Sequence, residues 1–392
     1  MTPSVLTLNS KLPGVTTTIF QTMSSIAQEA KAINLGQGSP DFDCAPELIQ
    51  SVHGAMLAGH NQYPPMIGSL NLRQAVVQKV EQLYRARYDV NGEITITSGA
   101  TQGLLTSILA TVHAGDEVIV IEPAYDSYVP SIQLAGGIPV RVPMHYLKSE
   151  ARFSYDWDLV RNALSPRTRM IIINSPHNPT GVCLDQEDLD TLAEIVRDSN
   201  IIILSDEVYE HMVFDRRKHN SLASHEELRQ RTLIVSSFGK TYHVTGWKIG
   251  YVLGPHNLMQ EFRKVHQFNV FTANSAMQIG IANFMEDPQP YLDLPGFYQA
   301  KRDYFRDGLS NTAFKLLPTE GSYFQCVDYS ELSDVSELEF ATWLCQQIGV
   351  AAIPISAFYH EKKDQKLVRF CFAKKITTLD QAIEKLQKLK FK

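Results

Sequence analysis

The chain has 392 residues, 44% of them hydrophobic and 20% charged, and its formal net charge is −6. This length predicts two domains, and the composition excludes disordered and fibrous proteins. The small acidic excess creates no field that attracts nucleic acid or an anionic membrane, so we expect neither as a partner. We find no signal peptide pattern and no run of about 20 apolar residues, and we therefore expect a soluble, cytoplasmic protein.

Cysteine and histidine usage gives no sign of a disulfide framework or a metal centre. The cysteines are scattered, odd in number and never in a C-x-x-C pair, so we expect reduced thiols. They are Cys44, Cys183, Cys326, Cys345 and Cys371. The histidines include no H-E-x-x-H pattern, and no metal site is predicted.

The middle of the chain alternates between short apolar runs and amphipathic stretches. The predicted strands are 94–97, 117–121, 170–173, 201–204 and 233–236, and the predicted helices include 101–113 and 185–199. Several of the runs are apolar at every position, as in a parallel sheet that helices cover on both faces. The pattern predicts an α/β fold with a mostly parallel sheet.

The two ends of the chain show a different pattern. Residues 1–45 are rich in loop-forming residues, and residues from about 291 onward alternate helices with strands at 322–327, 350–355 and 367–372. We therefore predict a large domain over 46–290. Residues 1–45 and 291–392 are predicted to form a smaller α+β domain.

Residues suited to ligand binding follow the predicted strands, where open α/β sheets bind their ligands. Gly99, Ala100 and Thr101 open a helix and could approach a phosphate, although an ordinary strand-to-helix turn explains them equally well. Tyr125 could lie on a planar ligand, or simply pack at the surface. Asn178 presents an amide that can donate to an oxygen anion.

The next two strands are followed by charged side chains. Asp206 could hold a buried cation, or it could cap a helix. Tyr209 follows it, and the last of these loops carries Ser237, Lys240 and Lys248.

Two nucleotide-binding motifs are excluded. The Gly-Lys-Thr run at 239–241 has Ile234 where a P-loop requires its first glycine. The Gly-Gln-Gly run at 36–38 lacks the third glycine of a dinucleotide fingerprint and opens no helix.

The strand-end residues together match the needs of pyridoxal phosphate, an aldehyde on a pyridine ring with a phosphate. The lysine amine would form the Schiff base, and a carboxylate would keep the ring nitrogen protonated. Lys240 is the candidate for the Schiff base, and Asp206 is the candidate for the ring nitrogen. Tyr209 and Asn178 could hold the phenolic oxygen, and Tyr125 could cover the ring face. The candidates for the phosphate are Ala100, Thr101, Ser237 and Lys248.

Several strings in this sequence resemble the motifs of class I aminotransferases. They are Asn34–Phe42, Asn61–Tyr63, Asn174–Gly181, Ser205–Tyr209, Ser237–Lys240 with Thr245–Gly250, and Val368–Phe372. They stand in the family's order and cover essentially the whole chain. Within the family, the sequence is most similar to the methionine and kynurenine (glutamine-type) branches.

The resemblance implies the type I fold of pyridoxal-phosphate enzymes and further roles for single residues. Lys240 would carry the cofactor as an aldimine and then move a proton, with Gly99 in the phosphate cup. The substrate carboxylate would be bound by Arg369, with Asn178 and the backbone at Gly38. Tyr63 would reach the phosphate of the partner subunit in a homodimer with shared active sites. Phe20 and Phe271 would line an apolar pocket for the substrate side chain.

Two residues depart from the family's patterns. Lys248 stands where aspartate aminotransferases have arginine, which keeps the charge but loses the fork of donors. Ser39 stands where relatives often have phenylalanine, so the loop over the substrate is less apolar.

We therefore predict an aminotransferase that moves an amino group from a neutral L-amino acid (methionine, aromatic, kynurenine or glutamine-like) to a 2-oxo acid. One alternative is a cysteine-conjugate β-lyase that uses the same cofactor. Another is a regulator with an aminotransferase-like sensor domain, which would require a nucleic-acid-binding arm.

Overall fold

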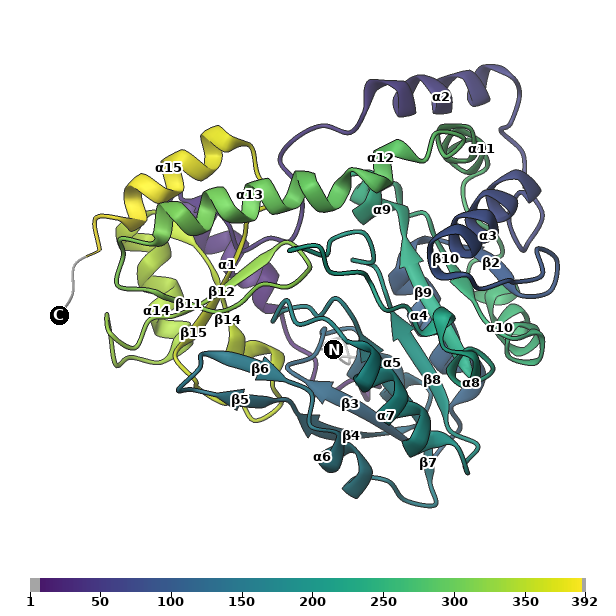
Figure 1. Cartoon of the computed structure of the whole chain (residues 1–392), viewed down its shortest axis with the longest axis horizontal. Coiled ribbons are helices and arrows are strands. Elements are labelled where there is room, and N and C mark those ends of the chain that lie inside the picture. Colours follow the sequence, from purple (N-terminus) through teal and green to yellow (C-terminus); the bar gives the residue numbers. More distant parts are fainter. Residues whose placement is uncertain (1–7, 390–392) are drawn as a thin grey trace, which may run out of the picture.

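Seven strands form the central sheet, in the order β2, β10, β9, β8, β7, β3 and β4 (Figure 1). The structure is a computed structural model and describes residues 8–389. β10 runs antiparallel to both of its neighbours, and the other strands are parallel to one another. The strands are β2 (Ile94–Thr97), β3 (Glu117–Glu122), β4 (Ile138–Pro143), β7 (Thr168–Asn174), β8 (Ile202–Asp206), β9 (Thr232–Ser237) and β10 (Gly250–Leu253). The predicted α/β class is confirmed.

Helices cover both faces of this sheet. Successive strand residues point to opposite faces, so one strand contributes apolar side chains to both layers. In β3, Val118 and Val120 join the apolar core on one face, whereas Ile119 and Ile121 join the core on the other. The first face packs against α4 (Gly99–Thr111), α5 (Tyr128–Leu134) and α10 (His256–Asn269), and the second against α3 (Leu70–Tyr84) and α7 (Gln186–Val196).

The five predicted strands form within a few residues of their expected limits, and the sheet has two more. The sequence analysis did not predict β4. This strand contains two prolines, which have no backbone N–H for pairing inside a sheet, and it lies at the edge of the sheet. β10, a four-residue strand that directly follows the loop containing Lys248, was not predicted either.

A second, antiparallel sheet has the order β11, β12, β15 and β14. Its strands are β11 (Lys315–Leu316), β12 (Phe324–Asp328), β14 (Ile353–Pro354) and β15 (Leu367–Cys371), and its helices are α13 (Leu294–Leu309), α14 (Glu337–Trp343) and α15 (Ile376–Leu386). The expected strand over 350–355 is split into β13 (Val350–Ala351) and β14.

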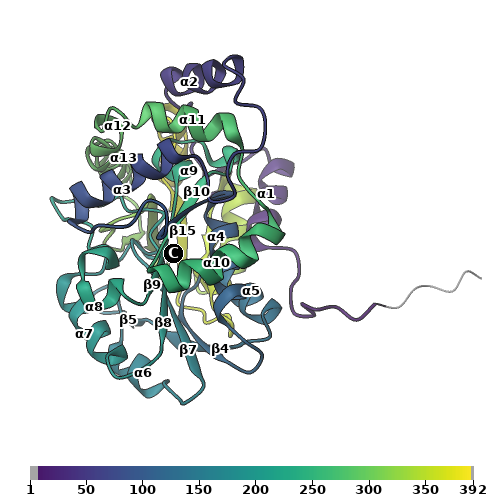
Figure 2. The ribbon, with the colours of Figure 1, turned by 90° about the vertical axis from the view of Figure 1, so that its right-hand side faces the viewer.

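The N-terminal segment contains a helix, so its description as loop-rich is wrong for α1 (Ile19–Glu29). Met23 and Ala27 are one helical turn apart and both are buried, and the Thr18 side chain caps the helix. β1 (Ile33–Asn34) then pairs with β13 and joins this segment to the C-terminal part. Figure 2 shows the described residues before α1 extending away from the body, and residues 1–7 lie outside the described part.

The remaining elements connect these layers. They are α2 (Pro46–Leu57), α6 (Trp157–Asn162), α8 (Glu226–Arg229), α9 (Phe238–Thr241), α11 (Ser275–Phe284), α12 (Gln289–Leu292), the hairpin of β5 (His145–Leu147) and β6 (Arg152–Ser154), 3₁₀ turns at Leu222–Ser224, Thr245–Trp247 and Ile355–Phe358, and a π turn at Leu344–Ile348. α2 packs on α11.

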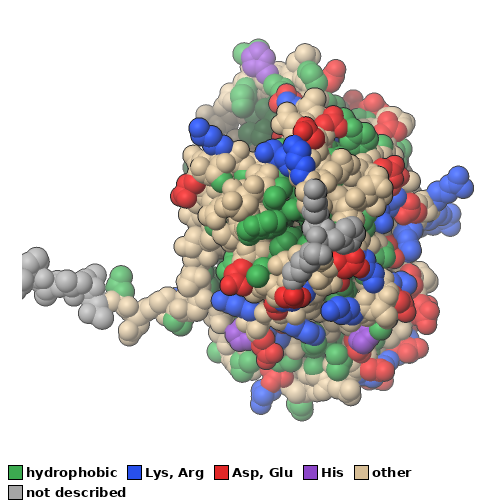
Figure 3. All heavy atoms as spheres, turned by 90° about the vertical axis from the view of Figure 1, so that its left-hand side faces the viewer, with side chains coloured by type: hydrophobic (Ala, Val, Ile, Leu, Met, Phe, Trp, Pro, Cys, Tyr) green, Lys and Arg blue, Asp and Glu red, His purple; other side chains and the backbone are tan. Residues whose placement is uncertain are grey.

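Acidic and basic side chains are mixed over the face shown in Figure 3. All five cysteines are free thiols; four are buried and Cys44 is half-buried. Among residues 8–389, no helix is both long and apolar enough to cross a membrane.

Candidate active site

The carboxyl ends of the parallel strands meet at one edge of the central sheet, as the sequence predicted. Asn174 at the end of β7 lies opposite Asp206 at the end of β8. A cavity of about 310 Å³ opens beyond these ends. Phe20, Gly38, Phe324 and Arg369, from the N- and C-terminal parts of the chain, line its other side.

Lys240 reaches the cavity from the turn of helix that follows β9. The Ser237 side chain caps this turn by accepting a hydrogen bond from the Gly239 N–H. Lys240 Nζ donates to the Tyr323 hydroxyl at 2.6 Å and to the Gly38 carbonyl at 3.1 Å. Burial lowers the pKa of this amine to about 8, so a large fraction of it is neutral in mildly alkaline solution.

Asp206 is a buried carboxylate at the centre of the sheet edge, with 4% of its surface exposed. The Tyr128 hydroxyl donates to its Oδ2 at 2.7 Å, and the Val208 N–H donates to its Oδ1 at 3.3 Å. Burial raises its pKa to about 6, and these two hydrogen bonds limit the rise. At pH 7 most of the carboxyl groups are therefore ionised and can pair with a cation.

Arg369 lies in β15 on the opposite wall and is 1% exposed. Its Nη1 donates to Asn178 Oδ1 at 2.6 Å and its Nη2 to the Gly36 carbonyl at 3.1 Å. Its guanidinium carbon lies 3.8 Å from the centroid of the Phe324 ring. Its Nε is buried without a hydrogen-bond partner in the described residues. A carboxylate is the natural acceptor for such an unsatisfied planar cation.

A cradle for an anion lies at the start of α4. Ser98 makes no side-chain hydrogen bond to the first turn, so the first N–H groups of this helix lack a side-chain cap. Gly99 has φ +75°, and a Cβ there would lie 3.3 Å from Lys248 Nζ. Lys248 also has a positive φ, +55°, and its side chain lies over this turn. Tyr125 and Thr101 line the cavity beside the cradle.

Most of the predicted site residues lie together in the cavity wall. They are Phe20, Gly38, Ala100, Thr101, Tyr125, Asn178, Asp206, Tyr209, Ser237, Lys240, Lys248 and Arg369. Gly99 lies beside them, against Lys248.

Tyr63 and Phe271 do not line this cavity within the chain. Their rings make an edge-to-face contact at 5.5 Å, and Tyr63 is 84% exposed. Tyr63 was predicted to act across a dimer interface and Phe271 to line the pocket for the substrate side chain, and both stay predictions.

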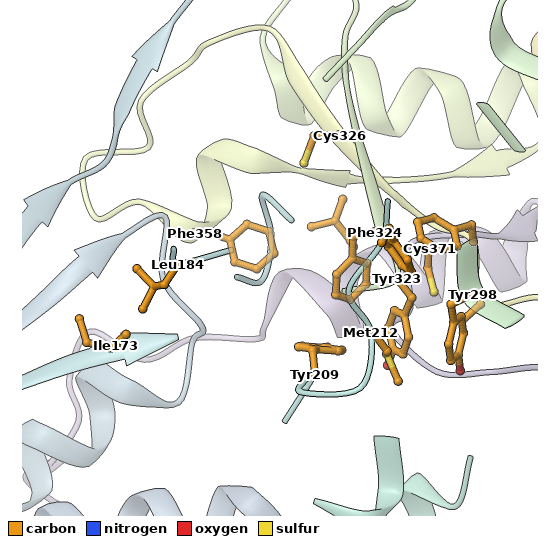
Figure 4. Packing of buried hydrophobic residues seen from close by; sticks show 14 of the residues in the cluster. Ile173, Leu184, Tyr209, Met212, Tyr298, Tyr323, Phe324, Cys326, Phe358 and Cys371 are labelled. Carbon is orange, nitrogen blue, oxygen red and sulfur yellow. The ribbon is translucent and has the colours of Figure 1, made fainter. Parts of the chain in front are cut away.

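The sequence did not identify four residues at the site. Tyr128 holds Asp206, and Asn174 accepts from the Asn178 N–H at 2.8 Å. Tyr323 contacts Lys240, and Phe324 lies under Arg369. Figure 4 shows Tyr209, Tyr323 and Phe324 grouped beside one another, with ring centroids 4.9–5.9 Å apart. The sequence predicts that such residues belong to the core. It does not show which core residues border a cavity.

The residues present fit pyridoxal phosphate. A buried amine, a buried carboxylate and a glycine-lined cradle beside a lysine lie around one cavity. These are the partners that the aldehyde, the ring nitrogen and the phosphate of the cofactor require.

Comparisons with known proteins agree with this geometry. The family model described as "Aminotransferase class I and II" matches residues 30–386. The chain is 45% identical to a methionine aminotransferase of Escherichia coli (strain K12), over 99% of this chain and 100% of that one. It is 33% identical to a human kynurenine–oxoglutarate transaminase 1, over 97% of each chain.

Solved structures show the same fold over nearly the whole chain. A crystal structure of an E. coli protein with methionine aminotransferase function superposes with a TM-score of 0.96, at 45% identity, over 98% of this chain and 100% of that one. The N-succinyldiaminopimelate aminotransferase of Mycobacterium tuberculosis gives 0.93 at 38% identity, over 98% and 100%. The chain therefore belongs to the class I and II aminotransferases and has the type I fold of these pyridoxal-phosphate-dependent enzymes.

Proposed function

We propose that this aminotransferase takes its amino group from a neutral L-amino acid, such as methionine, an aromatic amino acid, kynurenine or glutamine, and passes it to a 2-oxo acid. The observation that carries this proposal is the set of cations around the cavity. Among the described residues that line it, the lysines and arginines are Lys240, Lys248 and Arg369. Each of them has a role other than binding a second carboxylate.

Pyridoxal phosphate, when bound, supplies an aldehyde that takes the amino group and a ring that accepts the electron pair left when the substrate Cα loses its proton. Lys240 would bind the cofactor covalently, and its free amine would accept that proton at Nζ. Asp206 would keep the ring nitrogen protonated. Tyr209 and Asn178 would hold the phenolic oxygen, and Tyr125 would cover the ring.

The phosphate and the substrate would bind at opposite ends of the cavity. Gly99, Ala100, Thr101, Ser237 and Lys248 would surround the phosphate with N–H groups, hydroxyls and one positive charge. Arg369 would bind the substrate carboxylate through its unsatisfied Nε and an Nη. This assignment leaves the amine of Lys240 facing the space between the two ends.

The substrate side chain would contact apolar surface. Phe20 packs edge-to-face on Phe358 at 5.8 Å, and the guanidinium of Arg369 lies 5.5 Å from the Phe20 ring. A second carboxylate would be buried there without a cation, which is costly. The sequence from Gln267 to Ser275, expected to approach from the neighbouring subunit, also contains no lysine or arginine.

We infer that the active unit is a homodimer. Tyr63, Phe268 and Phe271 are exposed, with Phe268 at 85%. Met56 and Leu57 at the end of α2 are exposed as well. Exposed aromatic and apolar side chains in one region are typical of a surface that a second subunit covers. The domain limits of 46–290 for the large domain, with 1–45 and 291–392 forming the small one, stay a prediction, as does the cytoplasmic location.

The relatives reported above are aminotransferases, which favours transamination over the β-lyase alternative. They differ in the donors that their names give, because one is a methionine aminotransferase and another acts on N-succinyldiaminopimelate. The second donor is acidic, so it provides a sharp comparison.

The test is a panel of donors measured against one common 2-oxo acid. We expect kcat/KM for methionine, phenylalanine, kynurenine and glutamine to exceed that for aspartate and N-succinyldiaminopimelate. Selectivity among the apolar donors should be graded, because one methylene in an apolar pocket contributes about 1–3 kcal/mol. Lys240→Ala serves as the inactive control. An acidic donor equal to the best neutral one would overturn the proposed substrate class.

A further inference from the structure

Tyr323 is a buried tyrosine whose hydroxyl lies at the centre of a small hydrogen-bonded triangle. It accepts from Lys240 Nζ at 2.6 Å and donates to the Gly38 carbonyl at 2.6 Å. Lys240 Nζ also donates to the same carbonyl at 3.1 Å. The residue is fully buried in the core, and its ring lies beside those of Tyr209 and Phe324 (Figure 4).

The other corner of the triangle, the Gly38 carbonyl, is also held firmly. A Cβ at Gly38 would lie 2.9 Å from the Phe324 ring, so the backbone approaches this ring as closely as only glycine allows. On the next residue, the Ser39 carbonyl accepts from Lys374 Nζ at 2.7 Å. Lys374 is itself buried. The loop that presents the carbonyl is therefore fixed to the start of α15.

The two oxygens suit the protonated form of the lysine. Both can accept from an ammonium group, and the Tyr209 and Tyr323 rings lie 5.5 and 5.1 Å from Nζ, within the range of cation–π attraction. Hydrogen bonds to a charged donor are stronger than those between neutral groups. The triangle thus offsets part of the cost of burying a positive charge.

We propose that the Tyr323 hydroxyl and the Gly38 carbonyl form the resting place of the free Lys240 amine, and that Tyr323 is a positioning residue for proton transfer by Lys240. This rests on the proposed role of Lys240 as the group that accepts the Cα proton. The proton would move from Cα to Nζ, the cofactor ring would accept the electron pair of the broken Cα–H bond, and the two oxygens would stabilise the new ammonium.

The charged and polar groups around Lys240 determine how much the Tyr323 hydroxyl changes the pKa of this amine. The groups that act on this amine are Asp206, Tyr209, Lys248, Tyr323, Arg369 and Cys371. Lys248 and Arg369 disfavour the ammonium, whereas Asp206 favours it. Removing the Tyr323 oxygen leaves these charges in place and takes away one acceptor, so the pKa of Lys240 should fall.

The experiment compares Tyr323→Phe with Tyr298→Phe. Tyr298 is a fully buried neighbour, 5.8 Å from the Tyr323 ring, and its hydroxyl has no partner among the described residues. Each variant loses one buried oxygen and keeps its ring. The first readout uses the cofactor-free full-length chain. Its Lys240 is modified by reductive methylation across a pH series, and the product is quantified on the peptide that contains Lys240.

We expect the apparent pKa of Lys240 to fall by about one unit in Tyr323→Phe and to stay at the wild-type value in Tyr298→Phe. In the loaded enzyme, kcat should fall by about 10-fold or more in Tyr323→Phe, with KM for methionine within twofold. The acidic limb of the kcat–pH profile should move to lower pH.

An unchanged Lys240 profile together with kcat within twofold of wild type would overturn the proposal. Equal effects of the two variants would also overturn it, because they would indicate a general effect of lost packing. The methylation readout needs no transamination. A wild-type chain that fails to transaminate would refute the proposed function, and the methylation profiles would still decide whether Tyr323 stabilises the Lys240 ammonium.

Discussion

Replacing Asp206 with asparagine should change activity and stability in opposite directions. The asparagine keeps the shape and one acceptor oxygen for Tyr128, which now donates to Asp206 Oδ2 at 2.7 Å. It removes the charge that would hold the proton on the ring nitrogen. We expect the transamination rate to fall at least ~10²-fold, which corresponds to about 2.7 kcal/mol of transition-state stabilisation.

The stability of the cofactor-free chain should increase. Burial raises the pKa of Asp206 from the ordinary 3.8 to about 6, so the folded chain favours the neutral carboxyl. The cost of holding the charged form appears as the pH rises from about 4 to about 6 and is complete above that. One pKa unit corresponds to about 1.4 kcal/mol, so Asp206→Asn should be more stable than wild type by up to about 3 kcal/mol at pH 7 to 8.

The assay is urea unfolding of the cofactor-free chains at pH 4 and pH 7.5, with kcat measured on the loaded enzymes. The difference in the free energy of unfolding should be large at pH 7.5 and small at pH 4. Asp198→Asn, at an exposed aspartate beyond α7, is the control and should show neither effect. A kcat of Asp206→Asn within threefold of wild type would contradict the proposed role of the Asp206 charge, and so would a stability relative to wild type that is the same at both pH values.

Three further predictions concern Lys240, Arg369 and Tyr63. Lys240→Ala should abolish the label that borohydride fixes on this residue in the yellow wild-type protein and should lower activity by about 10³-fold or more; a label on another lysine would contradict the assignment. Arg369→Lys should lower kcat/KM for every donor by about 10–100-fold, because the planar fork is lost, and equal values would exclude the carboxylate role. Tyr63→Phe should weaken cofactor binding, and the wild type should sediment as a dimer; a fully active monomer would refute the shared site.

Most strands of the central sheet could be predicted because each contains an apolar run that is visible in the sequence. β3, β7, β8 and β9 each contain a continuous apolar run, and each run is followed by polar residues that the topology brings to one edge. The edge strand β4 carries no such signal, since half-exposed positions and two prolines do not distinguish a strand from a loop. α1 was hidden for a similar reason, because only two of its residues, Met23 and Ala27, are buried.

The site was predictable where a residue follows a strand, and less so where it comes from the other side of the cavity. Asp206 is the last residue of β8, and Lys240 lies in the helical turn that follows β9, so their positions follow from the sheet. Arg369 lies inside β15, and only a family motif singled it out. Tyr323 and Tyr128 read as core residues, because their contacts with Lys240 and Asp206 depend on how distant segments pack.

The two charged groups at the heart of the cavity are held apart, and this explains why their pKa values move toward each other. Lys240 and Asp206 are both buried, yet none of the ion pairs among residues 8–389 joins them. Instead, Lys240 donates hydrogen bonds to Tyr323 and Gly38, and Asp206 accepts one from Tyr128. Each group therefore bears the cost of burial with only neutral hydrogen-bond partners, which lowers the pKa of the amine to about 8 and raises that of the carboxyl to about 6. A direct salt bridge would stabilise the chain and close the space between them. Keeping them apart preserves a gap with an amine on one side and an anion on the other, which is what a cationic ring bearing an aldehyde requires.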